Sequence, residues 1–178
     1  MKLLFVTLIP KISLFFLLTI TTNAKIPTKK LFNDICKNTK YPKVCLIILK
    51  DDPMTRNASN YHDLGLGSLD IAISLAKLSE DFFNNSLVKM KNSAQKQKYV
   101  DCRDKYKLAM EELSEAKTML RKIDFATATK SLEIAYKLPT SCLKELGEPP
   151  AKVRRTNATL DVIFDIAFVI VKRVGSGQ

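Results

Sequence analysis

The stretch YVDCRDKYKLAMEELSEAKTMLRK, residues 99–122, decides the fold of this chain. It contains neither glycine nor proline, and charged side chains occupy most positions between its apolar residues. Those apolar residues recur every three or four positions: Cys102, Tyr106, Ala109, Met110, Leu113, Ala116 and Leu120. This period places them on one face of a helix. A helix of this length extends about 36 Å, so its apolar face must pack against helices of comparable length.

Three other segments carry a helical pattern of apolar residues, and no segment alternates in the manner of a strand. They span residues 61–89, 124–146 and 152–174, with a break at residues 147–150, GEPP. Shorter apolar faces at residues 26–39 and 42–51 predict a small helical hairpin, with a turn at Tyr41-Pro42. We therefore predict an all-α fold, an up-down-up-down four-helix bundle at about 61–175 with an N-terminal hairpin at about 26–51.

The first 24 residues predict a signal peptide. Lys2 precedes two apolar runs, at residues 3–9 and 12–20, and the segment closes on Thr22-Asn23-Ala24. Small residues there suit cleavage after Ala24, which leaves residues 25–178 as one domain. The alternative is an N-terminal membrane anchor, which the Pro10-Lys11 interruption disfavours. We expect a secreted, extracellular protein with no membrane segment after cleavage.

The remaining chain has an even number of cysteines, which in an exported protein indicates two disulfides but allows three pairings. They are Cys36, Cys45, Cys102 and Cys142. Residues that lie level in an antiparallel helix pair are equidistant from its turn. The midpoint of Cys36 and Cys45 falls on the predicted turn before Pro42. That of Cys102 and Cys142 falls at residue 122, where the long helix should stop and Asp124 can cap the next helix. We therefore predict the pairs Cys36–Cys45 and Cys102–Cys142, which would staple both hairpins.

The chain is strongly basic. Cleavage of the leader removes two lysines and no acid, which lowers the formal charge from +11 to +9. With no nucleic-acid motif and no tryptophan, DNA and RNA are not expected partners. Six lysines crowd one predicted helix junction, as a solvated helix end or as a surface for an acidic partner: Lys89, Lys91, Lys96, Lys98, Lys105 and Lys107. Three glycosylation sequons accompany the leader, at Asn57, Asn84 and Asn157.

No catalytic constellation is apparent in the sequence. His62 is the lone histidine, the cysteines are assigned to disulfides, and no cysteine pair has the short spacing of zinc sites. The carboxylate pairs Glu111/Glu112 and Asp161/Asp165 fall on predicted helices, where solvated or capping roles are the default. We expect no metal, no cofactor and no enzymatic activity.

Several motifs together resemble those of the plant invertase and pectin methylesterase inhibitor family. CKNTKYPKVC, residues 36–45, is similar to that family's first cysteine pair, and VDCRDKY, residues 100–106, is similar to its third-cysteine motif. Asp124-Phe125 opening a helix that Cys142 closes completes the likeness. Where invertase-inhibiting members carry Pro-Lys-Phe this chain has Ile123-Asp124-Phe125, which resembles a pollen-allergen-type subgroup.

The resemblance implies a four-helix bundle with sequential disulfides that acts in the apoplast or cell wall as a monomeric enzyme inhibitor. Its expected partner is pectin methylesterase or acid invertase, in a 1:1 complex that blocks the substrate cleft. Phe125 is the candidate interface residue, and its alternative role is a turn residue packed in the core. The alternative function is a basic apoplastic binding or defence protein that recognises an acidic polysaccharide such as pectin without inhibiting an enzyme.

Overall fold

The computed structural model describes residues 27–91 and 94–177, and the predicted signal peptide lies outside these ranges. Helices are the only regular secondary structure in the described residues, which confirms the all-α fold. They are α1 (Thr28–Cys36), α2 (Pro42–Asp51), α3 (Tyr61–Lys89), α4 (Ala94–Arg121), α5 (Phe125–Leu146) and α6 (Ala151–Gly175).

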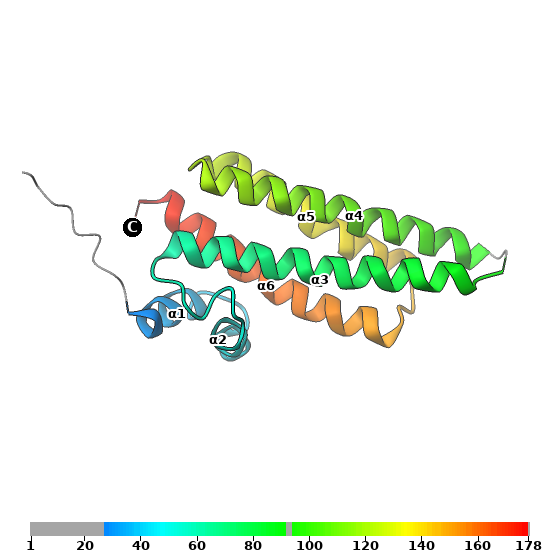
Figure 1. The fold of residues 1–178 in the computed structure, drawn as a ribbon, viewed down its shortest axis with the longest axis horizontal. Coiled ribbons are helices and arrows are strands. Elements are labelled where there is room, and N and C mark those ends of the chain that lie inside the picture. The colour runs from blue at the N-terminus through cyan, green and yellow to red at the C-terminus, as the bar shows by residue number, and fades with distance from the viewer. Residues whose placement is uncertain (1–26, 92–93, 178) are drawn as a thin grey trace, which may run out of the picture.

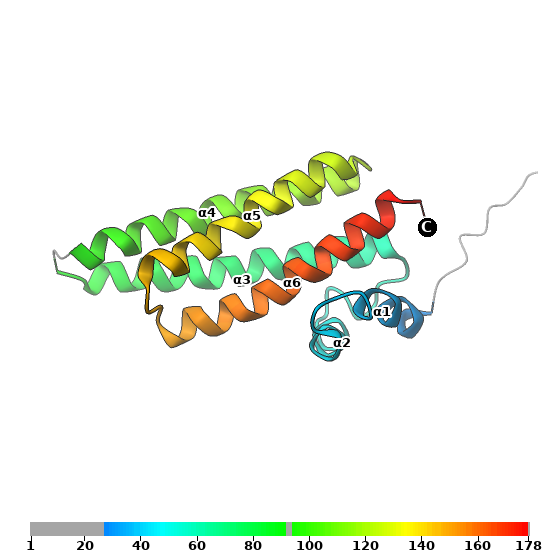
Figure 2. The same cartoon turned by 180° about the vertical axis from the view of Figure 1, so that it is seen from behind.

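The four long helices lie lengthwise beside one another and alternate in direction (Figures 1 and 2). α4 packs between α3 and α5, and α6 closes the bundle by packing against the same two helices. The up-down-up-down bundle is therefore confirmed. One end of the bundle carries the α4–α5 turn, the start of α3 and the end of α6, and the α5–α6 connection lies at the opposite end.

The apolar stripe of α4 forms the centre of the core. Every residue of the predicted stripe is buried except Met110, which is half-buried. Tyr106 stacks on Phe83 of α3 with 5.8 Å between ring centroids, and its hydroxyl donates to Asn157 Oδ1 of α6 at 3.1 Å. Burial raises the pKa of Tyr106 to about 12. α4 begins five residues before the predicted stretch, because AQKQK at residues 94–98 consists of good helix formers.

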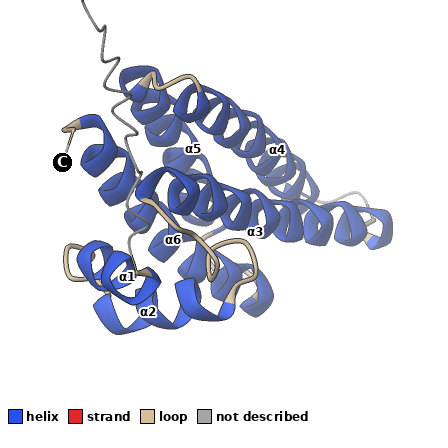
Figure 3. Cartoon of the chain, turned by 60° about the vertical axis from the view of Figure 1, so that its left-hand side comes forward, coloured by secondary structure: helices blue, strands red, loops and turns tan. Residues whose placement is uncertain are grey.

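The N-terminal hairpin packs beside the bundle against α6 (Figure 3). Cys36 and Cys45 are bonded across its turn, with their Cα atoms 5.5 Å apart. α1 ends at Cys36 rather than near Thr39, whose hydroxyl donates to the Cys36 carbonyl at 2.8 Å and satisfies it within a turn. Asp165 of α6 accepts a 2.7 Å hydrogen bond from the Lys40 backbone N–H, so one of the sequence-predicted carboxylates holds the hairpin turn.

The second disulfide joins α4 and α5 at the end opposite their turn. Cys102 and Cys142 are bonded, with their Cα atoms 4.9 Å apart, and both are fully buried. α5 runs past buried Pro139 to Leu146, although Pro139 has no N–H to offer the carbonyl of Ala135. Among the described helices, none is long and apolar enough to cross a membrane.

Candidate partner-binding surface

The turn between α4 and α5 has an unusual residue at its tip. The Asp124 N–H donates to the Met119 carbonyl at 2.9 Å, and the Ile123 N–H donates to the Leu120 carbonyl at 3.1 Å. This pair of bonds is the Schellman motif, whose C′ residue adopts a left-handed conformation and is usually glycine. Here that residue is Ile123, with φ of 63°. A β-branched residue in this conformation costs about 1–2 kcal/mol.

Ile123 is also one of the most exposed large apolar residues of the described chain, with 68% of its surface accessible. It is preceded by exposed Arg121 and Lys122 and followed by exposed Asp124. The turn thus presents one exposed apolar side chain on a hydrogen-bonded backbone, with two cations next to it in the sequence. Strained residues persist where the surrounding structure over-determines them and cluster at ligand-binding positions.

Asp124 fixes the other side of this turn. Its Oδ1 accepts from the Thr127 N–H at 3.0 Å and its Oδ2 from the Thr127 hydroxyl at 2.7 Å, so it caps the first turn of α5. These bonds to Thr127 lower the pKa of the Asp124 carboxyl. The predicted cap is confirmed, and it holds the backbone on the α5 side of Ile123.

Phe125 lies directly behind the tip and is half-buried. It packs against the core and against the end of α6, where a Cβ built on Gly175 would lie 3.2 Å from the Phe125 Cβ. Its packing fits the alternative role of a turn residue in the core, and a direct partner contact stays a prediction. Sequence reasoning selected the aromatic residue and missed Ile123. The available signal was the absence of glycine or asparagine after the last helical residue of α4.

The groups required for acid–base chemistry are not brought together. His62 Nε2 lies 3.1 Å from the carbonyl oxygen of Leu120, at the end of α4. Glu111 is exposed on α4, whereas Asp161 and Asp165 are on α6 beside the hairpin turn. Within residues 27–91 and 94–177, no group of histidine, cysteine and acidic side chains is arranged to hold a metal ion.

Four of the six lysines of the predicted cluster lie at the α3–α4 junction, Lys89, Lys91, Lys96 and Lys98, and the other two lie further along α4. Lys89 ends α3, and Lys98 lies in the first turns of α4. Lys105 forms an ion pair with Glu145 of α5, which lowers the pKa of the Glu145 carboxyl, and exposed Lys107 lies further along the helix.

The three glycosylation sequons differ in their structural setting. Asn57 is exposed in the α2–α3 loop, whereas Asn84 and Asn157 are half-buried on α3 and α6.

Comparison with known proteins gives one consistent result. The profile of the family described as plant invertase/pectin methylesterase inhibitor matches residues 30–167. A pectinesterase inhibitor of Actinidia deliciosa is 28% identical over 144 residues, which cover 79% of this chain and 77% of that protein. The cell wall / vacuolar inhibitor of fructosidase 2 of Arabidopsis thaliana is 27% identical over 179 residues, covering 91% of this chain and 97% of that protein.

Two crystal structures share the fold. A mutant form of a pectin methylesterase inhibitor from Arabidopsis gives a TM-score of 0.69 at 23% identity, over 79% of this chain and 95% of its own. A pectin methylesterase inhibitor from Arabidopsis thaliana gives a TM-score of 0.61 at 22% identity, over 80% of this chain and 95% of its own. Since the family profile spans most of the described bundle, the chain belongs to the plant invertase/pectin methylesterase inhibitor family and is an enzyme inhibitor, not an enzyme.

Proposed function

We propose that this protein is a secreted inhibitor of a plant cell-wall carbohydrate-active enzyme, either pectin methylesterase or acid invertase, and acts by covering the active-site cleft. The observation that carries the mode of action is Ile123, exposed and held in a left-handed conformation at the tip of the α4–α5 turn. The two relatives are named for inhibition of a pectinesterase and of a fructosidase, which supports both target classes.

The α4–α5 turn is suited to obstruct a cleft. Ile123 is fixed by the two backbone bonds of the Schellman motif and by the Asp124 cap, so it loses little conformational entropy on docking. An apolar anchor with a charged rim is the usual centre of a protein interface. In the proposed complex Ile123 enters the cleft, Arg121 and Lys122 face acidic groups at its rim, and Phe125 supports the turn from behind.

Several features of the chain support the proposed location. The predicted N-terminal leader, the sequons and the cysteines paired in disulfides are typical of an exported protein. We propose that the mature protein, residues 25–178, acts in the apoplast as a monomer that binds one enzyme molecule.

The test is a titration of the purified mature protein into a pectin methylesterase and, separately, an acid invertase at the acidic pH of the cell wall. We expect activity of one enzyme to fall to its minimum at one equivalent, with a 1:1 complex in light scattering. Full activity of both enzymes with excess protein would contradict the proposal. A plateau at half an equivalent would contradict the stoichiometry alone.

A further inference from the structure

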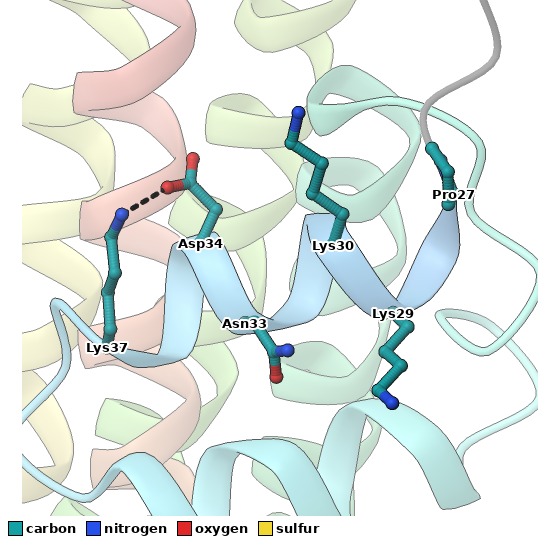
Figure 4. A pocket seen from close by; sticks show the side chains of 6 residues that line it. All are labelled: Pro27, Lys29, Lys30, Asn33, Asp34 and Lys37. Carbon is teal, nitrogen blue, oxygen red and sulfur yellow. Dashed lines mark ion pairs between the residues drawn. The ribbon is translucent and has the colours of Figure 1, made fainter.

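A groove runs along α1 and reaches the end of α6. Its first part is a shallow depression of about 480 Å³ on α1, lined by Pro27, Lys29, Lys30, Asn33, Asp34 and Lys37 (Figure 4). A second depression of about 320 Å³ is lined by Asp34, Ile35, Asn38, Val169, Lys172, Arg173 and Ser176. Asp34 lines both depressions, so they adjoin, and we call them together the α1–α6 groove.

The α1–α6 groove carries an excess of positive charge. Its one acid, Asp34, is neutralised by Lys37 Nζ at 2.6 Å and by a guanidinium nitrogen of Arg173 at 2.9 Å. Lys29, Lys30 and Lys172 are exposed, and they form no ion pair with any residue in the described part of the chain. In Figure 4 Lys29 and Lys30 project from opposite sides of the first turn of α1, so this end of the helix has a cation on each side.

The uncharged groups of the groove are suited to a hydroxylated ligand. Asn33 and Asn38 are exposed amides on α1 and in the turn that follows it, and Ser176 is an exposed hydroxyl at the end of α6. The groove holds no exposed aromatic or large aliphatic side chain, whereas protein interfaces centre on such anchors. Lysine ammonium groups act as mobile point charges, which suits carboxylates spread along a flexible chain.

We propose that the α1–α6 groove binds a linear acidic polysaccharide, with its carboxylates on Lys29, Lys30 and Lys172 and its hydroxyls on the amides between them. Ile123 does not line the groove. In this proposal the protein uses two different sets of residues, one for an enzyme and one that holds it on the acidic polymer of the wall. The second does not depend on which enzyme the first one inhibits, or on whether it inhibits one.

The experiment uses purified oligogalacturonate and no enzyme, with binding measured by calorimetry at low and physiological salt. We compare the wild type, the groove variant Lys29→Gln/Lys30→Gln/Lys172→Gln, and the matched variant Lys130→Gln/Lys137→Gln/Lys144→Gln on α5. All six lysines are exposed, and each variant loses the same formal charge. We expect the groove variant to bind about tenfold more weakly and the matched variant to bind as the wild type does. Binding should weaken at higher salt.

Three results would overturn the proposal: equal weakening in both variants, no binding of oligogalacturonate by the wild type, or binding to anionic phospholipid vesicles alone. Binding of fully methyl-esterified pectin as tight as that of the acid form would do the same, since the ester carries no charge. Helical circular dichroism of each variant checks the fold. Inhibition titrations of the groove variant should match the wild type, so that failure of the polysaccharide site is separable from failure of the inhibitor function.

Discussion

The hydroxyl of Tyr61, at the start of α3, donates a 2.6 Å hydrogen bond to the carboxylate of Asp34 on α1. The same carboxylate pairs with Lys37 of the hairpin and with Arg173 of α6, whose guanidinium carbon lies 5.3 Å from the centroid of the Tyr61 ring. Asp34 thus joins the hairpin to two bundle helices. The bonds from Lys37 and then Tyr61 lower the pKa of the Asp34 carboxyl.

Replacing Asp34 by asparagine should loosen this joint. Asp34→Asn keeps the shape of the side chain but removes the charge that three partners share, so we expect a loss of about 2 kcal/mol in the free energy of unfolding by urea. Glu133→Gln is the matched control, because Glu133 is exposed on α5 and forms no ion pair with a described residue. Equal stability of the two variants would show that Asp34 does not hold the hairpin.

The contribution of Asp34 should depend on pH. Since its pKa is lower in the folded protein, its stabilisation is present above the carboxyl pKa of the unfolded chain, about 3.9, and is lost as the pH falls through the folded value. Unfolding of the wild type and Asp34→Asn measured from pH 6 downward should therefore differ most near neutrality and converge in acid. A difference that grows in acid would refute this sign.

Ile123→Gly should change stability and inhibition in opposite directions. Glycine relieves the left-handed strain, so we expect a gain of about 1 kcal/mol in the free energy of unfolding. The same change removes the proposed anchor, so we expect inhibition of the target enzyme to weaken about tenfold. Stability is measured by urea unfolding and inhibition by enzyme titration.

Val88→Ala serves as the control for Ile123, because Val88 is 86% exposed near the end of α3. Its substitution should leave inhibition unchanged, since it lies outside the proposed contact. If Ile123→Gly inhibits as well as the wild type, the α4–α5 turn is not the contact surface.

The two disulfides should contribute unequally to the stability of the folded protein. The four cysteines are equally buried, but the pairs are separated by 9 and 40 residues in the sequence. The chain-entropy model then predicts that the free energy of unfolding falls by about 3 kcal/mol in Cys36→Ala/Cys45→Ala and by about 4 kcal/mol in Cys102→Ala/Cys142→Ala. Urea unfolding of both variants checks the order, and a larger loss for the hairpin pair would contradict it. Peptide mapping of secreted protein should find these two linkages.

The sequons should differ in occupancy. Asn57 is exposed in a loop, whereas Asn84 Nδ2 donates to Glu80 at 3.1 Å and Asn157 Oδ1 accepts from buried Tyr106. Because Asn57 is the exposed one of the three, we expect it to carry the glycan in a plant host. Asn57→Gln should then abolish the mass shift on enzymatic deglycosylation, and Asn157→Gln should leave the shift intact. A persistent shift in Asn57→Gln would place the glycan elsewhere.

The parts of the fold that local chemistry determines were predictable from the sequence. The spacing of Tyr106, Leu113 and Leu120 determines the buried face of α4 whatever packs on it. The turns could be located from Pro42 and Asp124, because a fixed φ and a capping carboxylate act within a few residues.

The candidate surfaces could not be predicted in the same way. The conformation of Ile123 opposes its own intrinsic preference and follows from the bonds to Met119 and Leu120. The packing of Phe125 against Gly175, and the placement of Lys172 beside Asp34, join residues that are far apart in the chain. Such neighbours exist only after the helices have packed.

The Cys102–Cys142 bond also determines what a protease would produce. Arg121 and Lys122 are exposed at the tip of the turn, where a trypsin-like enzyme could cut the chain. The two fragments would stay covalently joined through α4 and α5 at the opposite end of the bundle. A nicked molecule would therefore migrate at full length until a reductant is added.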